Sequence, residues 1–247
     1  MLRDLKIAVV FLTRLPLKLE GPVRVSDLAS VVHCFPIVGL LVGTLGAVVY
    51  VAASLAHLPS LPAVILTIGA MALFTGALHE DGLADTADAL GALPDRERAL
   101  EVMRDSRIGS FGAIALVLVL TGRLSALAGF WSAFEAALAI IAAAAFSRAL
   151  MPAVMYVQPS ARGRGLAAEA GRPPVERVLT ALAIGIAVVI LALSPGQALS
   201  AIFIASATAA LVAWALGRAF GGCTGDTLGA VQQLTELAFL FTLAAWR

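Results

Sequence analysis

The chain has 247 residues, of which 60% are hydrophobic and only 13% are charged. Ordinary soluble domains carry about twice that charged fraction, so the composition excludes a soluble domain and predicts an all-α polytopic membrane protein. A net charge of +1 and the lack of a basic patch interleaved with aromatic residues predict no nucleic-acid partner. Cys34 and Cys223 have no metal-type spacing and are interpreted as small apolar fillers.

The first segment, residues 1–19, mixes apolar side chains with five charged ones. It is too short and too charged to span a bilayer easily, so we predict an N-terminal amphipathic helix at the cytosolic membrane surface. Arg14 and Pro16 interrupt its apolar run, which argues against a cleavable signal peptide.

Seven apolar segments follow, each with about the twenty residues that a hydrocarbon core requires. Their predicted bounds are 29–56, 61 to the acidic stretch, 108–130, 133–157, 178–193, 198–216 and 227–246. Pro94 ends the helix that carries the acids, and 95–107 is predicted as a surface helix. Because no internal repeat is evident, we expect residues 1–247 to form one integral-membrane catalytic domain.

The distribution of positive charge predicts the orientation. Fourteen of the 17 Lys and Arg residues lie in the N-terminal segment or in the loops 79–107, 158–177 and 218–226, which share one side if there are seven spans. The positive-inside rule places this side in the cytosol, in a multi-pass protein of the cell inner (plasma) membrane. Every polar motif lies on the same side, so we expect a cytosolic active site.

An acidic stretch from Leu78 to Gly109 holds eight of the sixteen acids and contains HEDGLADTADALG. Asp81, Asp85 and Asp88 stand at i, i+4 and i+7, which places them on one helix face, where they repel one another. Small residues separate them, and a divalent cation would reverse the repulsion. Oxygen-only ligands favour Mg²⁺ or Mn²⁺ over Zn²⁺. The alternative interpretation is a solvated acidic helix end.

A second motif, MRDSRIGSFG, covers Met103 to Gly112 at the entry to the third predicted span. Asp105 is a candidate metal ligand, and Arg104 and Arg107 are candidates to hold phosphate oxygens. The alternative interpretation is a positively charged flank of the span.

A third motif, GGCTGDTLGA from Gly221 to Ala230, is a glycine-rich turn before a helix. Free backbone N–H groups at a helix N-terminus bind anions, so Gly222, Thr224 and Gly225 are candidate substrate contacts. Asp226 is a further candidate metal ligand. The motif lacks the lysine of a P-loop, and a simple N-cap is the alternative.

Four single residues carry further hypotheses. His79 is a candidate general base or phosphate contact, with a surface histidine as the alternative. Arg148 and Glu236 lie inside predicted spans, where an ionisable side chain is either functional or part of a structural pair. Arg14, in FLTRLP, is a candidate lipid-headgroup anchor or substrate contact.

The three motifs in this order, with FLTRLP and the FPIVG of Phe35 to Gly39, resemble the cobalamin synthase (adenosylcobinamide-GDP ribazoletransferase) family. The resemblance covers essentially the whole chain. It implies a membrane enzyme that joins adenosylcobinamide-GDP to α-ribazole or α-ribazole 5′-phosphate, releases GMP and requires Mg²⁺. It also supports the functional acids, which are Asp81, Asp85, Asp88, Asp105 and Asp226.

Chemistry of this kind depends on positioning and on neutralising negative charge. A ribazole hydroxyl attacks the phosphate attached to cobinamide, and GMP leaves. We assign Asp85 or Asp88 as the general base, with Asp81 and Asp226 among the metal ligands. Arg104 and Arg107 are expected to hold the diphosphate.

Two other classes of function stay open at this stage. A CDP-alcohol phosphatidyltransferase would use a similar acidic motif to make a phospholipid. A cation-coupled transporter would distribute its acids through the middle of the membrane, whereas here they crowd at one surface. Membrane lipid is an expected partner, and a homo-oligomer is left open.

Overall fold

In a computed structural model, which describes residues 2–19, 21–22, 24–105, 107–130, 132–162 and 165–246, the chain is folded into helices with no strand among these residues. The helices are α1 (Leu2–Leu12), α2 (Asp27–Val31), the 3₁₀ helix η1 (Val32–Cys34), α3 (Phe35–Leu55), α4 (Ser60–Thr75), α5 (Leu78–Leu90), α6 (Arg96–Val102), α7 (Ser110–Ala128), α8 (Ala133–Val157), α9 (Leu166–Ala170), α10 (Val175–Ala192), α11 (Pro195–Phe220) and α12 (Gly225–Ala244). The predicted all-α fold is therefore confirmed.

Within the described ranges, five segments are long and apolar enough to cross a membrane. They are Asp27–Leu55, α7, α8, α10 and α11. Helices α4 and α5 qualify only as a pair that is bent by 89°. Seven spans were predicted, and α12 is the predicted span that is not among these candidates. This helix is 20 residues long, but it buries Gln232, Gln233 and Glu236 instead of presenting apolar side chains to lipid.

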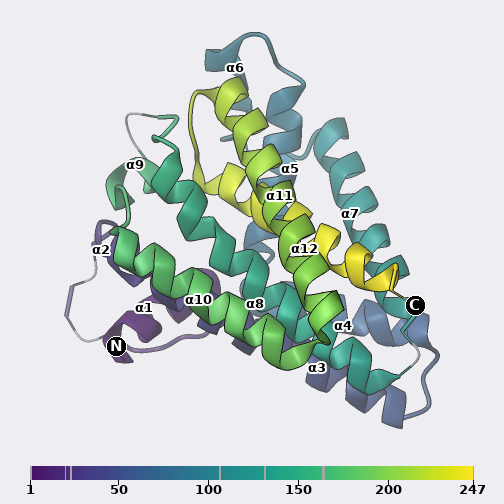
Figure 1. Ribbon diagram of the computed structural model, residues 1–247. Coiled ribbons are helices and arrows are strands. Elements are labelled where there is room, and N and C mark those ends of the chain that lie inside the picture. Colours follow the sequence, from purple (N-terminus) through teal and green to yellow (C-terminus); the bar gives the residue numbers. More distant parts are fainter. Residues whose placement is uncertain are drawn as a thin grey trace.

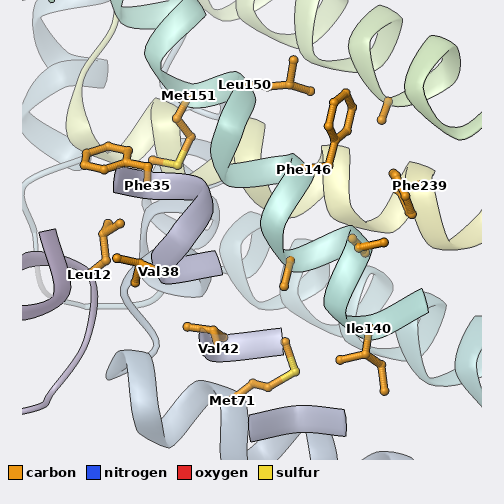
Figure 2. Close-up of a cluster of buried hydrophobic side chains, with 14 of the residues drawn as sticks. Leu12, Phe35, Val38, Val42, Met71, Ile140, Phe146, Leu150, Met151 and Phe239 are labelled. Atoms are coloured by element: carbon orange, nitrogen blue, oxygen red, sulfur yellow. The ribbon is translucent and has the colours of Figure 1, made fainter. Parts of the chain in front are cut away.

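The core forms where α3 and α8 pack closely. A Cβ at Gly39 or Gly43 of α3 would meet the backbone of α8, so the two helices approach each other through small residues, as membrane helices commonly do. Phe35 and Met151 lie together at one end of the buried apolar cluster, and Phe146 and Phe239 lie at the other (Figure 2). The packing of α3 on α8 fixes the frame against which the remaining helices are placed.

A sharp turn separates α4 from the acidic helix α5. Gly76 and Ala77 both have positive φ angles, +68° and +55°, and their N–H groups bond the carbonyls of Leu73 and Ala72. This left-handed ending stops a helix and redirects the chain. The expected span from residue 61 into the acids is thus broken, and α5 turns away from α4.

Helix α12 crosses the middle of the bundle, packed against α5, α7, α8 and α11 (Figure 1). Its first turns meet α5 at two glycines. A Cβ at Gly82 would lie 2.8 Å from the Asp226 carbonyl oxygen, and one at Gly229 would lie 3.2 Å from the His79 Cα. This close crossing brings the acids of α5 to the N-terminus of α12.

Candidate active site

The site is built where α5 meets the N-terminus of α12. Asp85 is half-buried on α5, and the carboxylates of Asp81, Asp88 and Asp226 act on it electrostatically, with Arg162 as a counter-charge. The helical spacing therefore does place the three acids of α5 together, and the fold adds Asp226 to them. Four carboxylates near one arginine leave an excess of negative charge.

Asp226 lies in the first turn of α12, which begins with a capping box. The Thr224 side chain accepts a hydrogen bond from the Thr227 N–H at 3.1 Å, so Thr224 is the N-cap. Arg162 approaches Asp226, with 3.9 Å between Nη1 and Oδ2. Burial raises the pKa of Asp226 and lowers the pKa of Arg162. Each group therefore holds its charge at an energetic cost that a bound ligand of opposite charge would reduce.

Asp88 makes two backbone hydrogen bonds that its predicted roles did not include. Its Oδ2 accepts the Gly109 N–H at 2.7 Å and its Oδ1 accepts the Gly112 N–H at 2.8 Å. A Cβ at either glycine would collide with the Asp88 carboxylate. Asp88 thus anchors the N-terminus of α7 to α5. Because both its oxygens already have donors, the assignment of general base is better made to Asp85.

Asp105 and Arg107 pair with each other at the surface. The distance from Arg107 Nη2 to Asp105 Oδ2 is 2.6 Å, and this guanidinium lowers the pKa of Asp105 to about 2. The predicted roles of Asp105 as a metal ligand and of Arg107 as a phosphate contact stay predictions. Arg104 is exposed, and its charge acts on Arg162, so these two arginines form the cationic flank of the acids.

Two glycines of the glycine-rich turn differ in the space around them. A Cβ at Gly222 would meet Pro159 and Ala161, and Cys223 exchanges backbone hydrogen bonds with the same two residues at 2.8 and 2.9 Å. The close approach that Gly222 permits is therefore used by the protein itself, not by a substrate. At Gly225, in contrast, a Cβ would meet nothing within 4 Å.

His79 and Arg148 belong to a buried polar network. His79 is 2% exposed, with its Nδ1 3.5 Å from Arg148 Nη2, so the surface histidine of the alternative interpretation is excluded. Arg148 lies 3.6 Å from Glu236, which also bonds Arg123, and Arg123 lies 3.6 Å from Glu80. Arg148 is therefore paired with Glu236 inside the bundle, and its predicted role as a substrate contact stays a prediction.

Arg14 contacts the turn between α4 and α5. Its backbone N–H bonds the Phe74 carbonyl at 2.8 Å, and its side chain packs over Gly76. The side chain is exposed, and both of its predicted roles stay predictions.

Sequence reasoning did not single out Arg162 or Arg123. Arg162 lies in an arginine-rich loop, and a parallel bridge between Ser160 and Cys223 carries that loop to α12. No local pattern signals this long-range contact. Arg123 lies within the predicted span 108–130, where a charged side chain generally has a buried partner.

The donor set can be compared with the needs of a metal ion. Among the described residues, no three His, Cys, Asp or Glu side chains are close enough to form a metal centre as they stand. The chemistry of Asp81, Asp85 and Asp226 nevertheless suits a hard cation, because all their donor atoms are oxygen and their negative charge exceeds that of Arg162.

Known proteins are similar to this chain along nearly its whole length. The family model described as cobalamin-5-phosphate synthase matches residues 4–244. The chain belongs to this family. A member from Bradyrhizobium diazoefficiens, named adenosylcobinamide-GDP ribazoletransferase, is 45% identical over 99% of this chain and 94% of its own. Proteins of the same name from Azorhizobium caulinodans and Mesorhizobium japonicum are each 41% identical over 97% of this chain, and over 94% and 92% of their own.

No solved structure matches the chain. Membership of the cobalamin-5-phosphate synthase family replaces both alternatives that the sequence left open, the phospholipid-forming transferase and the cation-coupled transporter. The chain is an enzyme of cobalamin synthesis, a transferase.

Proposed function

We propose that this member of the cobalamin-5-phosphate synthase family joins adenosylcobinamide-GDP to α-ribazole or α-ribazole 5′-phosphate and releases GMP. The names of its relatives supply the two substrates. The observation that carries the proposal is the meeting of α5 and α12, where carboxylates outnumber the arginine beside them. Such a site suits a reaction in which a diphosphate must be held and a hydroxyl must lose its proton.

The residues divide the work as follows. A ribazole hydroxyl oxygen forms a bond to the phosphorus on the cobinamide side, and the bond from that phosphorus to the GMP oxygen breaks. Asp85 takes the proton from the hydroxyl. Arg104 and Arg162 bind the diphosphate oxygens and stabilise the charge that spreads over them.

Asp81 and Asp226 would hold Mg²⁺, or Mn²⁺, together with Asp85. When bound, the cation supplies charge neutralisation at the diphosphate. The protein's own part is to keep the carboxylates of α5 at the N-terminus of α12, through the close crossing at Gly82 and Gly229.

The orientation is also part of the proposal. The acid cluster lies next to loops rich in arginine. By the positive-inside rule, these loops would face the cytosol if the protein is in the inner membrane of the cell. Arg107→Cys is a suitable probe, because the two native cysteines are buried. A thiol reagent that does not cross membranes should label it in inside-out vesicles and not in intact cells.

The activity is tested with purified protein in detergent. We expect GMP release when adenosylcobinamide-GDP and α-ribazole are both present, and no CMP release from a CDP-activated lipid. GMP release that needs no α-ribazole, or CMP release from the lipid, would overturn the proposal.

A further inference from the structure

Beside the acids lies a cavity of about 230 Å³, which Asp81 and Asp226 both line. We propose that this cavity binds the benzimidazole base of ribazole and thereby presents a ribose hydroxyl to the acids of α5 and α12. The proposal rests on the transfer proposed above and adds to it the place and orientation of the acceptor substrate.

The walls of the cavity are mostly apolar. Residues from α1, α3, α8 and α12 line it, among them Phe11, Leu12, Phe35, Met151, Met155 and Leu228. Figure 2 shows Leu12, Phe35 and Met151 together at one end of the buried cluster. The rings of Phe11 and Phe35 are stacked, with their centroids 6.3 Å apart and 25° between their planes. Aromatic faces and flexible thioethers are suited to a flat aromatic ligand.

The volume limits what can enter. Pockets for drug-sized ligands measure about 300–1,000 Å³, so this cavity takes a single fused ring system and not a corrin macrocycle or a whole guanosine diphosphate. A guanine base carries polar groups along most of its edges, and the apolar part of the wall offers them no partner. Of the two substrates, the benzimidazole of ribazole is the part that matches in both size and polarity.

The polar part of the lining comes from two helices only, among the described residues. Of the described residues that line it, the ionisable ones are His79, Asp81 and Asp226, from α5 and α12. A ribose attached to a base in the apolar part would reach these carboxylates, which accept hydrogen bonds from hydroxyl groups. Asp85, the proposed base, is coupled electrostatically to both Asp81 and Asp226. Binding of the benzimidazole in the cavity would therefore bring the reacting hydroxyl of the ribose close to Asp85, the proposed general base.

Gly225 provides a way to fill the cavity. It lines the cavity, and a Cβ added there meets nothing within 4 Å, so a leucine at this position would occupy space instead of colliding with the fold. Gly69 in α4 offers a matched control, because a Cβ there also meets nothing within 4 Å but the residue lies outside the cavity.

The first experiment measures the KM of each substrate in turn. In Gly225→Leu we expect the KM for α-ribazole to rise by about 10-fold or more through loss of apolar contact, while the KM for adenosylcobinamide-GDP stays within about twofold. In Gly69→Leu neither KM should change. A KM for α-ribazole that is unchanged in a folded Gly225→Leu protein would overturn the proposal.

The second experiment varies the ligand. The wild-type enzyme should use a benzimidazole riboside without the two ring methyl groups about 15-fold less efficiently, as kcat/KM, than α-ribazole; this is about 0.8 kcal/mol for each buried methyl group. The preference should shrink to about threefold or less in Met155→Ala, which loosens the same wall. Met155→Ala also carries the test if Gly225→Leu does not fold. Equal use of both ribosides by the wild type would contradict the proposal.

The experiments distinguish an error in the proposed cavity from an error in the proposed reaction. If the wild type transfers the cobinamide phosphate to every riboside equally well, the cavity assignment is wrong and the reaction stands. If the wild type releases no GMP from any pair, the reaction is wrong. Equilibrium dialysis of α-ribazole alone against wild-type and Met155→Ala protein then still tests the cavity, and binding that is equal in both overturns it.

Discussion

Two groups of charges share the same helices but are arranged in opposite ways. In the buried network, Glu80 and Glu236 face Arg123 and Arg148, so two negative charges meet two positive ones. One residue further along α5, Asp81 belongs to a cluster of carboxylates that Arg162 does not balance.

We assign the balanced network to stability and the unbalanced cluster to function. The network is balanced in charge and connects α5, α7, α8 and α12, although His79 Nε2, Arg123 Nε and Arg148 Nε have no hydrogen-bond partner among the described residues. An unbalanced cluster at the edge of a cavity is destabilised by its own repulsion until a cation or a protonated ligand joins it. Substitutions that change the charges of one group at a time should therefore have different effects on activity and on stability.

The largest expected effect is on catalysis. Asp85→Asn removes the proposed base and should lower kcat by about 10²–10⁴-fold, without lowering Tm, because like-charge repulsion is relieved. Glu97→Gln, on an exposed acid of α6, should leave kcat unchanged. Near wild-type kcat in Asp85→Asn would transfer the role of base to another group.

The buried network should respond in stability. Arg123→Ala leaves Glu236 without its short ion pair, and we expect a loss of about 3–5 kcal/mol in the free energy of unfolding. Arg98→Ala, which removes the exposed pair with Glu101, should have no measurable effect. Thermal unfolding in detergent compares the two variants. Equal Tm values would show that the network does not hold the helices together.

Asp88 shares features of both groups of charges. It belongs to the acidic face of α5, but its carboxylate accepts hydrogen bonds from two backbone N–H groups. Asp88→Ala leaves the N–H groups of Gly109 and Gly112 without their acceptor, and we expect a loss of about 1.5–3 kcal/mol. Asp88→Asn keeps one oxygen acceptor and should lose less. If Asp88→Ala abolishes activity with no change in Tm, Asp88 acts in chemistry and not as an anchor of α7.

The smallest effect concerns pH. Burial raises the pKa of Asp226, so the folded protein binds this proton more readily than the unfolded chain, and the ionised group destabilises the fold at neutral pH. In EDTA at pH 7, Asp226→Asn should therefore raise Tm, by about 2–4 °C for each kcal/mol of the burial cost that is removed. The gain should disappear below the ordinary aspartate pKa of about 3.9. A Tm difference that is independent of pH would contradict this origin.

Much of the fold was predictable from local pattern. Helix α8 has the predicted bounds of 133–157, because Ser132 caps its first turn and the apolar run ends at Gln158. The spacing of Asp81, Asp85 and Asp88 correctly placed them on one helix. The α4–α5 turn was missed, because an alanine in the left-handed conformation, as at Ala77, has no sequence signal.

The rest of the site depends on tertiary contacts. Asp88 bonds the N-terminus of α7, and Arg162 approaches Asp226. Both contacts follow from the packing of segments that are far apart in sequence. Helix α12 resembles a span in length, but its glutamines and Glu236 find their partners only inside the bundle.

The central claim is that the unbalanced carboxylates bind a divalent cation with the diphosphate, and GMP release measured as a function of free Mg²⁺ tests it most directly. We expect EDTA to abolish release, Mg²⁺ to restore it, and Asp81→Asn to require a higher Mg²⁺ concentration for half-maximal rate. Undiminished GMP release by the wild type in EDTA would contradict the claim.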